Sequence, residues 1–98
     1  MQELEEASKY QQLVSKWIHI YAELLDENIE LEAAANYVCI NVPFNYAKPQ
    51  SVAAVCIWAG ANKLKKSISP KEIIRVSAIS LTTFQNIKKY FKKRGMVG

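Results

Sequence analysis

Residues 52 to 61 decide the fold of this chain. From Val52 to Ala61 their sequence is Val-Ala-Ala-Val-Cys-Ile-Trp-Ala-Gly-Ala, without one charged residue. Pro49 comes just before and can occupy the first turn of a helix without losing a hydrogen bond, so a helix is predicted over residues 48–65. Such a stretch is too short to cross a bilayer. A helix that is apolar on every side must instead be wrapped by other helices, and its alanines and glycine let their backbones approach closely. We predict that this is the central helix of the domain.

The chain before the central helix has the periodicity of two further helices. Large apolar side chains recur at helical spacing over 9–26, which predicts one helix with a single buried stripe. A second helix is predicted over 28–42, with Asn28 as its N-cap and Pro43 ending it, because proline disfavours the α conformation at the residue before it. The first seven and last five residues are expected to be frayed ends. The predicted buried stripe of the first helix consists of Tyr10, Leu13, Val14, Trp17, Ile18, Tyr21 and Leu25.

Two shorter helices are predicted after the central one. Ser69-Pro70-Lys71-Glu72 combines an N-cap serine, a proline at the first helical position and a glutamate two residues later, an arrangement typical of a capping box, and it starts a helix over 69–77. Ser77 to Ser80 provide a turn and a second N-cap, and a fifth helix follows over 80–94. Its predicted buried side consists of Leu81, Phe84, Ile87 and Phe91. The whole chain is therefore predicted to be one all-α domain of five helices.

The net charge of +4 conceals a division between the two parts of the chain. Residues 1–32 contain eight of the nine acidic residues and only two lysines, a net charge of −6. Residues 33–98 contain eleven lysines and arginines and the single acid Glu72, a net charge of +10. Five of these positive residues fall between Lys88 and Arg94. This asymmetry suggests that the second part meets a polyanion, although solubility and intramolecular pairing are alternatives.

The start of the chain is acidic, unlike the basic and then apolar start of a signal peptide, and no stretch has the length of a membrane span. We therefore expect an intracellular protein without a membrane partner. Cys39 and Cys56 have apolar neighbours and no CxxC spacing, which favours buried thiols over a disulfide or metal pair.

No arrangement of residues favours an enzyme. His19 is the only histidine and lies between Ile18 and Ile20 without an acid nearby in sequence, so it is a poor candidate for a catalytic pair. The chain has no glycine-rich nucleotide-binding loop, and we expect neither a cofactor nor a small-molecule substrate. The acidic residues Asp26, Glu27, Glu30 and Glu32 could in principle bind a hard cation. Because they lack the spacing and glycine of a calcium loop, a solvated acidic face is favoured and no metal is expected.

The last two predicted helices are typical of a helix-turn-helix. The second of them opens with hydroxyl and amide side chains and ends in lysines, so its first turns could contact base edges in the major groove while its later residues reach phosphates. Two ordinary antiparallel helices with a solvated lysine face are an equally simple interpretation of this pattern alone. The predicted DNA-binding residues are Lys71, Thr82, Thr83, Gln85, Asn86, Lys88, Lys89, Lys92 and Lys93.

Three segments together resemble the cyclin-like repeat of transcription factor IIB and its relatives. They are Lys48 to Trp58 (Lys-Pro-Gln-Ser-Val-Ala-Ala-Val-Cys-Ile-Trp), Ser69 to Ile73 (Ser-Pro-Lys-Glu-Ile) and Thr83 to Asn86 (Thr-Phe-Gln-Asn). The resemblance covers roughly residues 10–93, and its specific part is 49–86. It implies a five-helix cyclin-like fold with a central third helix and a C-terminal helix-turn-helix, most similar to the second of the two repeats that the family carries. It also implies that residues 1–98 are one cyclin-like domain of a longer factor.

The resemblance implies a function and partners. The second repeat of the family binds promoter DNA beside the TATA box through its last two helices, so the expected partners are promoter double-stranded DNA, TATA-binding protein and RNA polymerase. The location would be the nucleus in a eukaryote, or the cytoplasm in an archaeon or for a cytoplasmic virus. An alternative is a cyclin-fold scaffold that binds only proteins, with the acidic N-terminal helices as its docking face.

The chain departs from the family at three positions. Thr82 and Gln85 stand where the family has an aliphatic residue and an arginine. Glutamine cannot reproduce a bidentate contact of arginine with guanine and suits adenine better, so the base preference should differ. Ala78 replaces a glycine of the helix-turn-helix, which predicts an altered turn or a strained backbone at that residue.

Overall fold

The computed structural model describes residues 2–25, 29–40, 42 and 46–95, with side chains from Lys9 onward. This part of the chain forms five α-helices and contains no β-strand. The helices are α1 (Gln2–Leu24), α2 (Ile29–Cys39), α3 (Pro49–Lys63), α4 (Pro70–Ser77) and α5 (Leu81–Lys93). The predicted all-α architecture of five helices is confirmed.

The predicted helix bounds hold within a few residues, except at the start of the chain. Helix α1 begins at Gln2, so the prediction that the first seven residues are a frayed end was wrong. Residues 2–8 are mostly good helix formers and include neither proline nor glycine, so the helix has no reason to stop there. Helix α2 ends at Cys39 instead of Val42, and the N–H of Val42 closes a tighter turn on the carbonyl of Cys39 at 3.1 Å. The predicted N-cap Asn28 and the predicted terminator Pro43 lie outside the described residues.

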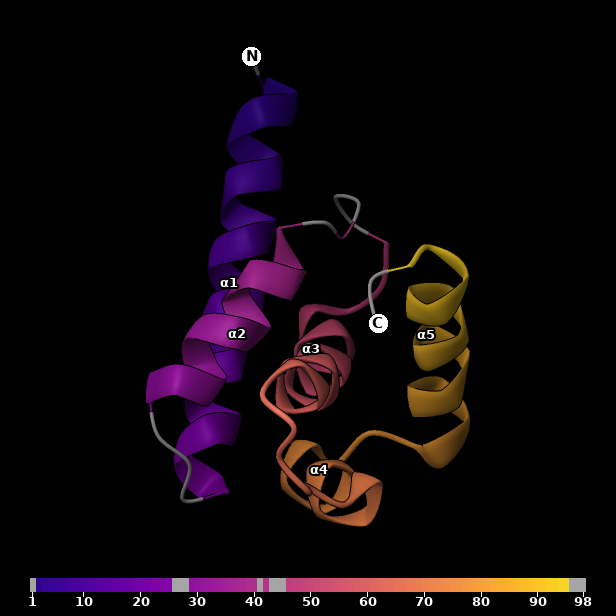
Figure 1. Cartoon of the computed structure of the whole chain (residues 1–98). Helices are drawn as coiled ribbons and strands as arrows, with labels where there is room; N and C mark the ends of the chain where they lie inside the picture. The colour runs from indigo at the N-terminus through magenta and orange to yellow at the C-terminus, as the bar shows by residue number, and fades with distance from the viewer. Residues whose placement is uncertain (1, 26–28, 41, 43–45, 96–98) are drawn as a thin grey trace.

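Helix α3 is the centre of the molecule, as predicted. It contacts each of the other four helices, and Figure 1 shows it almost end-on with those helices around it. Ten of its fifteen residues are buried. The close backbone approach expected at its glycine also occurs. A Cβ atom placed on Gly60 would lie 2.8 Å from the backbone nitrogen of Ala35, so α2 and α3 meet there with no room for a side chain.

Helix α1 packs on α3 through a narrower stripe than predicted. Val14, Ile18 and Tyr21 are buried, but Leu13 is 46% exposed. At 3.6 residues per turn Leu13 lies about 100° around the helix from Val14, which puts it at the margin of the stripe. Two tyrosines also attach α1 to the start of α3. The hydroxyl of Tyr10 donates to the carbonyl of Ala47 at 2.6 Å, and that of Tyr21 donates to the carbonyl of Gln50 at 3.3 Å.

Serine caps start both C-terminal helices. The Ser69 hydroxyl accepts the N–H of Lys71 at 3.1 Å, which confirms this N-cap. The reciprocal half of the predicted capping box is absent from the described residues, because the Glu72 carboxylate accepts from Arg75 at 2.8 Å instead. The Ser80 hydroxyl accepts the N–H of Thr83 at 3.1 Å, which confirms the cap of α5. Glu72, the single acid of the basic part, is thus paired within its own helix.

The turn between α4 and α5 consists of residues 78–80. Ala78 has φ 58° and ψ 24°, the left-handed conformation that an L side chain disfavours, and its N–H donates to the carbonyl of Ile74 at 2.8 Å. The strained backbone predicted at this alanine is therefore present. The turn brings α5 back against α3.

Helix α5 buries Phe84, Ile87 and Phe91 against the core, as predicted. The prediction for Leu81 was wrong, since its side chain is 57% exposed. Leu81 lies about 120° around the helix from Ile87. Its spacing of three residues from Phe84 therefore does not place it on the buried side. The buried side of α5 is thus a line of three residues, and its exposed residues lie on the other sides of the helix.

Candidate nucleic-acid interface

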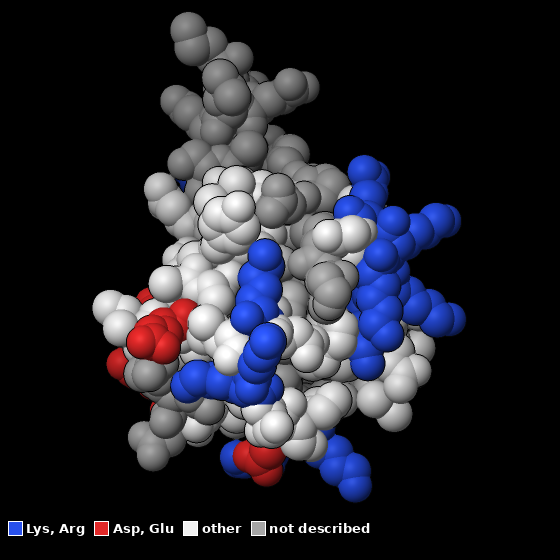
Figure 2. Space-filling model, in the orientation of Figure 1, with Lys and Arg blue, Asp and Glu red and all other residues white. Residues whose placement is uncertain are grey.

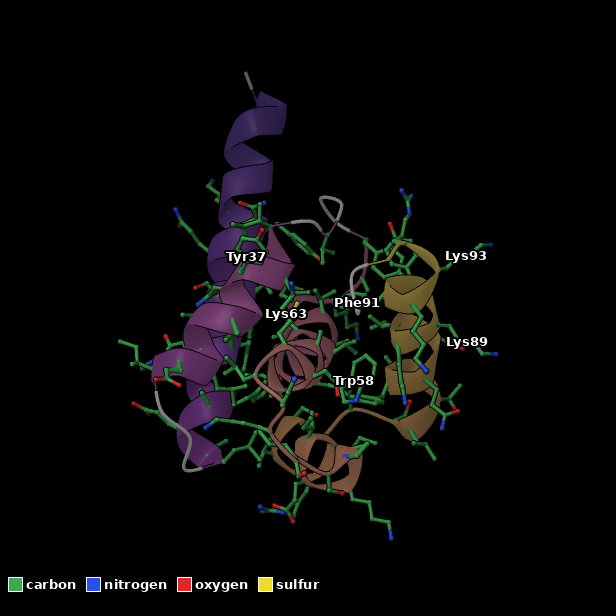
Figure 3. All side chains as sticks on the ribbon, viewed as in Figure 1. Tyr37, Trp58, Lys63, Lys89, Phe91 and Lys93 are labelled. Carbon is green, nitrogen blue, oxygen red and sulfur yellow. The ribbon has the colours of Figure 1, made fainter. Side chains whose placement is uncertain are left out.

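One outer face of α5 presents polar residues first and lysines later. Thr82, Asn86, Lys89 and Lys93 are all exposed and recur at steps of three or four, so they form one line along the helix, opposite the buried aromatic side. We call these four residues the α5 outer face. In Figure 3 the side chains of Lys89 and Lys93 extend away from the body of the molecule, while Phe91 points inward. Four of the predicted DNA-binding residues are therefore brought together here.

Gln85, Lys88, Lys89 and Lys92 line a shallow hollow of about 190 Å³ beside the α5 outer face. Lys88 differs from the other three because it is half-buried and its Nζ lies 4.7 Å from the centre of the Trp58 ring. A cation over the face of an indole ring is attracted by the ring electrons. Trp58 itself packs edge-on against Phe84, with ring centres 6.3 Å apart. Lys88 thus connects the basic surface of α5 to the central helix.

The remaining two predicted residues lie apart from the α5 outer face. Thr83 is half-buried in the cap, where its hydroxyl oxygen accepts a hydrogen bond from Ser80 at 2.8 Å. Lys71 is exposed in the first turn of α4, a different helix. In contrast, the exposed side chains of Thr82, Gln85 and Asn86 make no hydrogen bond within the described part of the chain, so their donors and acceptors are available to a ligand.

The basic residues of the second part gather in more than one place. Figure 2 shows lysine and arginine side chains along α5 and a separate group over the end of α3, with acidic side chains on the other side of the view. Lys63, Lys65 and Lys66 occupy the end of α3 and the residues after it. The Nζ of Lys63 lies 5.0 Å from the centre of the Tyr37 ring on α2. This contact could not be predicted, because the two residues are far apart in sequence and share no motif.

A third surface joins the start of α3 to the turn before α5. A hollow of about 560 Å³ lies there, which we call the α3–α5 hollow. Sequence analysis missed it, since its two walls are separated by about 30 residues in the chain. Its polar lining consists of Lys48, Gln50, Ser51, Ser77, Ser80 and Thr83.

The acidic part of the chain forms a contact between α1 and α2. His19 Nδ1 lies 3.1 Å from both carboxylate oxygens of Glu32, and its Nε2 lies 3.2 Å from Glu23. The expectation that His19 has no acid nearby in sequence was wrong, because Glu23 is four residues further along α1 and four residues is about one helical turn. The hydrogen bond and charge of Glu32, with the charge of Glu23, raise the pKa of His19. Of the four acids considered for a cation, Glu32 is therefore paired with His19, and Asp26 and Glu27 lie outside the described residues. No group of ligating side chains suited to a metal ion occurs among the residues with described positions.

A hollow of about 580 Å³ lies on the outside of α1 and α2. It is lined by both amide side chains and exposed apolar groups, the latter including Tyr37 and Ile40, which are 63% and 65% exposed. We call this surface the α1–α2 hollow. Its lining is thus half polar and half apolar, and it contains no lysine or arginine.

Both cysteines are free and buried, which confirms the prediction of buried thiols. Burial raises the pKa of Cys56 well above its ordinary value. Its thiol is therefore protonated and contributes to the packing of α3.

None of the described helices has the combination of length and apolar character that crossing a membrane requires. Comparisons of the chain with protein-family models, with curated proteins and with solved structures find no match.

Proposed function

We propose that this chain is a transcription-initiation module, similar to a repeat of transcription factor IIB, that binds promoter DNA through α4 and α5. The observation that carries the proposal is the α5 outer face, on which Thr82 and Asn86 precede Lys89 and Lys93 along one line. The proposed role of α5 is that of the recognition helix of a helix-turn-helix. Its first turns meet base edges and its later lysines meet phosphates.

The two ends of α5 contribute differently to binding. Each phosphate that a lysine neutralises releases counterions, so the lysines provide affinity that falls with salt and does not depend on sequence. Gln85 and Asn86 can each donate to and accept from one adenine, so they provide the base preference. The proposal therefore assigns affinity to the C-terminal half of α5 and specificity to its N-terminal half.

The proposed protein partners are TATA-binding protein and RNA polymerase. Their support is the resemblance of residues 48–58, 69–73 and 83–86 to transcription factor IIB. In this proposal the module holds TATA-binding protein on its DNA inside the cell, in the nucleus of a eukaryote or wherever the promoter is transcribed.

The experiment compares two variants of identical net charge. Lys89→Ala/Lys93→Ala removes two lysines from the α5 outer face, and Lys9→Ala/Lys16→Ala removes two exposed lysines from α1. Binding of each to a duplex of about two helical turns is measured by fluorescence anisotropy over a range of salt concentrations. We expect only the first variant to lose affinity, with the slope of log K against log salt falling by about 1.8 for two phosphates. Equal binding by both variants contradicts the assignment of α5 as the DNA-binding helix.

A second candidate is a protein-interaction scaffold without direct DNA contact, favoured by the exposed Tyr37 and Ile40 beside the α1–α2 hollow. Capture of purified TATA-binding protein tests it with Tyr37→Ser and Glu30→Lys, both at exposed positions of α2. This candidate expects both substitutions to abolish capture while DNA binding stays undetectable. Capture that survives both substitutions contradicts it.

A further inference from the structure

The α3–α5 hollow contains the one buried polar side chain among the described residues. Ser51 is only 7% exposed, whereas the other buried side chains are hydrophobic. Its hydroxyl makes no hydrogen bond within the described structure, yet it borders the hollow and is not sealed from it. The Ser51 hydroxyl oxygen thus keeps access to solvent through the hollow, and with no partner in the described structure it is available to bond to a ligand there.

The surroundings of Ser51 favour a negatively charged ligand. Ser51 is the third residue of α3, so the hollow lies at the positive end of a fifteen-residue helix dipole. In this first turn the N–H groups of Ser51 and Val52 both donate to the carbonyl of Lys48, while the N–H of Gln50 has no backbone acceptor among the described residues. Gln50 and Ser51, both of which line the hollow, thus each have a polar hydrogen without an acceptor in the described structure.

Further positive character comes from both sides of the hollow. The exposed Lys48 is among the residues that line it, and Ser80 and Thr83 at the start of α5 bring a second helix N-terminus to it. No carboxylate occurs in its lining. Two helix N-termini, one lysine and one unpaired hydroxyl thus face the same space.

The C-terminal end of α4 is the one neighbouring element whose charge disfavours an anion in the hollow. Ser77 and Ala78, at the C-terminal end of α4, also line the hollow, and a helix C-terminus is negative. Two of its last carbonyls are already occupied, because Ile73 accepts from the Ser77 hydroxyl at 2.7 Å and Ile74 accepts from the N–H of Ala78 at 2.8 Å. Helix α4 has only eight residues, so its opposition is weaker than the combined effect of α3, α5 and Lys48.

We propose that the α3–α5 hollow binds a phosphate group through the Ser51 hydroxyl, the N–H of Gln50 and the Lys48 ammonium. The source that fits best is the backbone of the DNA bound by α5, and this part rests on the proposed function. The hollow adjoins the first turn of α5, and its volume exceeds that of a lone phosphate, which leaves space for the attached sugars. A phosphate held there fixes where α5 enters the groove, whereas Gln85 and Asn86 in the first turns of α5 read the bases.

The test uses the whole chain labelled with ¹⁵N, titrated first with inorganic phosphate and then with duplex DNA, against chloride at equal ionic strength. We expect both probes to shift the amide resonances of Gln50, Ser51 and Ser80. Ser51→Ala should weaken binding of each probe about tenfold, as for one hydrogen bond to a charged group. Lys48→Ala should weaken both and lower the salt slope for DNA by about 0.9.

Two substitutions provide matched controls. Ser67→Ala and Lys65→Ala change the same residue types at exposed positions outside the hollow. Both should leave the phosphate titration unchanged. Thermal unfolding followed by circular dichroism verifies that Ser51→Ala is folded, and the exposed Lys48→Ala gives an independent result if it is not.

The outcomes separate the inference from the proposed function. If phosphate shifts the three amides but DNA does not, the anion site stands and its source is free phosphate, so the assignment to the DNA backbone is overturned. If neither probe shifts them while Lys89→Ala/Lys93→Ala still loses DNA binding, the hollow is not a site and the proposed function stands. If no DNA binds but phosphate does, the proposed function fails and the anion site stands. If Ser67→Ala and Lys65→Ala weaken phosphate binding as much as Ser51→Ala and Lys48→Ala do, the hollow is not the phosphate site.

Discussion

Ala78 is one of two described residues other than glycine with a positive φ; the second is Lys65. A left-handed conformation costs an L residue about 1–2 kcal/mol and costs glycine almost nothing. Ala78 nevertheless has φ 58° because it closes α4 and turns the chain toward Ser80. The Cβ of Ala78 is therefore the source of the conformational strain in this turn.

We expect Ala78→Gly to stabilise the protein. The relief of strain exceeds the entropy that glycine adds to the unfolded chain, so the free energy of unfolding in urea should rise by about 0.5–1 kcal/mol. Ala33→Gly is the matched control, since Ala33 is exposed within α2 and should lose about 0.5–1 kcal/mol. A loss of stability in both variants is incompatible with strain at residue 78.

His19 should make stability depend on pH. The charged groups that face it are Glu23 on its own helix and Glu32 on α2, and they raise its pKa in the folded state above 6.5. The folded state therefore binds the proton more tightly. The resulting stabilisation is complete below about 6.5 and is lost as the pH rises through the raised pKa.

Because His19 is the only histidine, its ring resonance gives an unambiguous titration by NMR. We expect its pKa to fall toward the ordinary value in Glu32→Gln and to fall less in Glu23→Gln. An unchanged titration in Glu32→Gln would show that the contact between α1 and α2 is not formed in solution.

These residues mark what local sequence can and cannot predict. The caps Ser69 and Ser80 were predictable because a cap is made with residues two or three positions away. The pairing of His19 with Glu32 was not, because it spans thirteen residues and depends on how α1 crosses α2. The α3–α5 hollow was unpredictable for the same reason, since Ser51 is an ordinary helix residue until Ser80 lies near it.

At the scale of the helices, α2 and α3 approach each other at Gly60 so closely that no side chain fits between their backbones. The periodicity predicted that α3 would be surrounded and that its glycine would matter, but not which helix would meet it. Gly60 meets the backbone of Ala34 and Ala35, and this pairing follows from the crossing of two helices whose sequences contain no sign of it.

We expect Gly60→Ala to destabilise the protein even though alanine favours a helix by about 1 kcal/mol over glycine. The new Cβ would lie 2.8 Å from the Ala35 nitrogen, and backbone atoms cannot yield as a flexible side chain does. Overpacking of this kind costs about 1–3 kcal/mol, which outweighs the gain in helix propensity. Thermal unfolding should show a lower Tm.

Asn62→Ala is the control for Gly60→Ala, because Asn62 is exposed near the end of the same helix. It gains helix propensity without a new contact, so its Tm should stay the same or rise. A rise in both variants would mean that α2 and α3 can separate freely at this point.

At the scale of the whole molecule, the charged side chains that the structure describes lie on different sides according to their sign. Figure 2 shows acidic side chains over α2 on one side and basic side chains along α5 on the other. The field of such a molecule depends on where charges lie as well as on their sum. Position in the chain predicts an acidic and a basic group, whereas the separation of Lys63, Lys65 and Lys66 from the lysines of α5 depends on how the helices pack.

Two variants with the same net charge should therefore separate on a heparin column. Lys89→Ala/Lys93→Ala and Lys9→Ala/Lys16→Ala each lower the net charge of +4 by two. We expect the first to elute at a clearly lower salt concentration, because a polyanion meets the α5 side of the molecule. Elution of both at one salt concentration would mean that net charge alone governs the interaction.

Because α3 is central, the basic surface of α5 cannot be moved to another protein as a short peptide. Helices α4 and α5 have eight and thirteen residues, lengths at which an isolated helix is marginal in water, and their apolar sides are covered by α3. Helix α3 in turn needs α1 and α2 to cover its other sides. A peptide of residues 69–95 would thus be unstructured, and the smallest portable form of this surface is the five-helix domain itself.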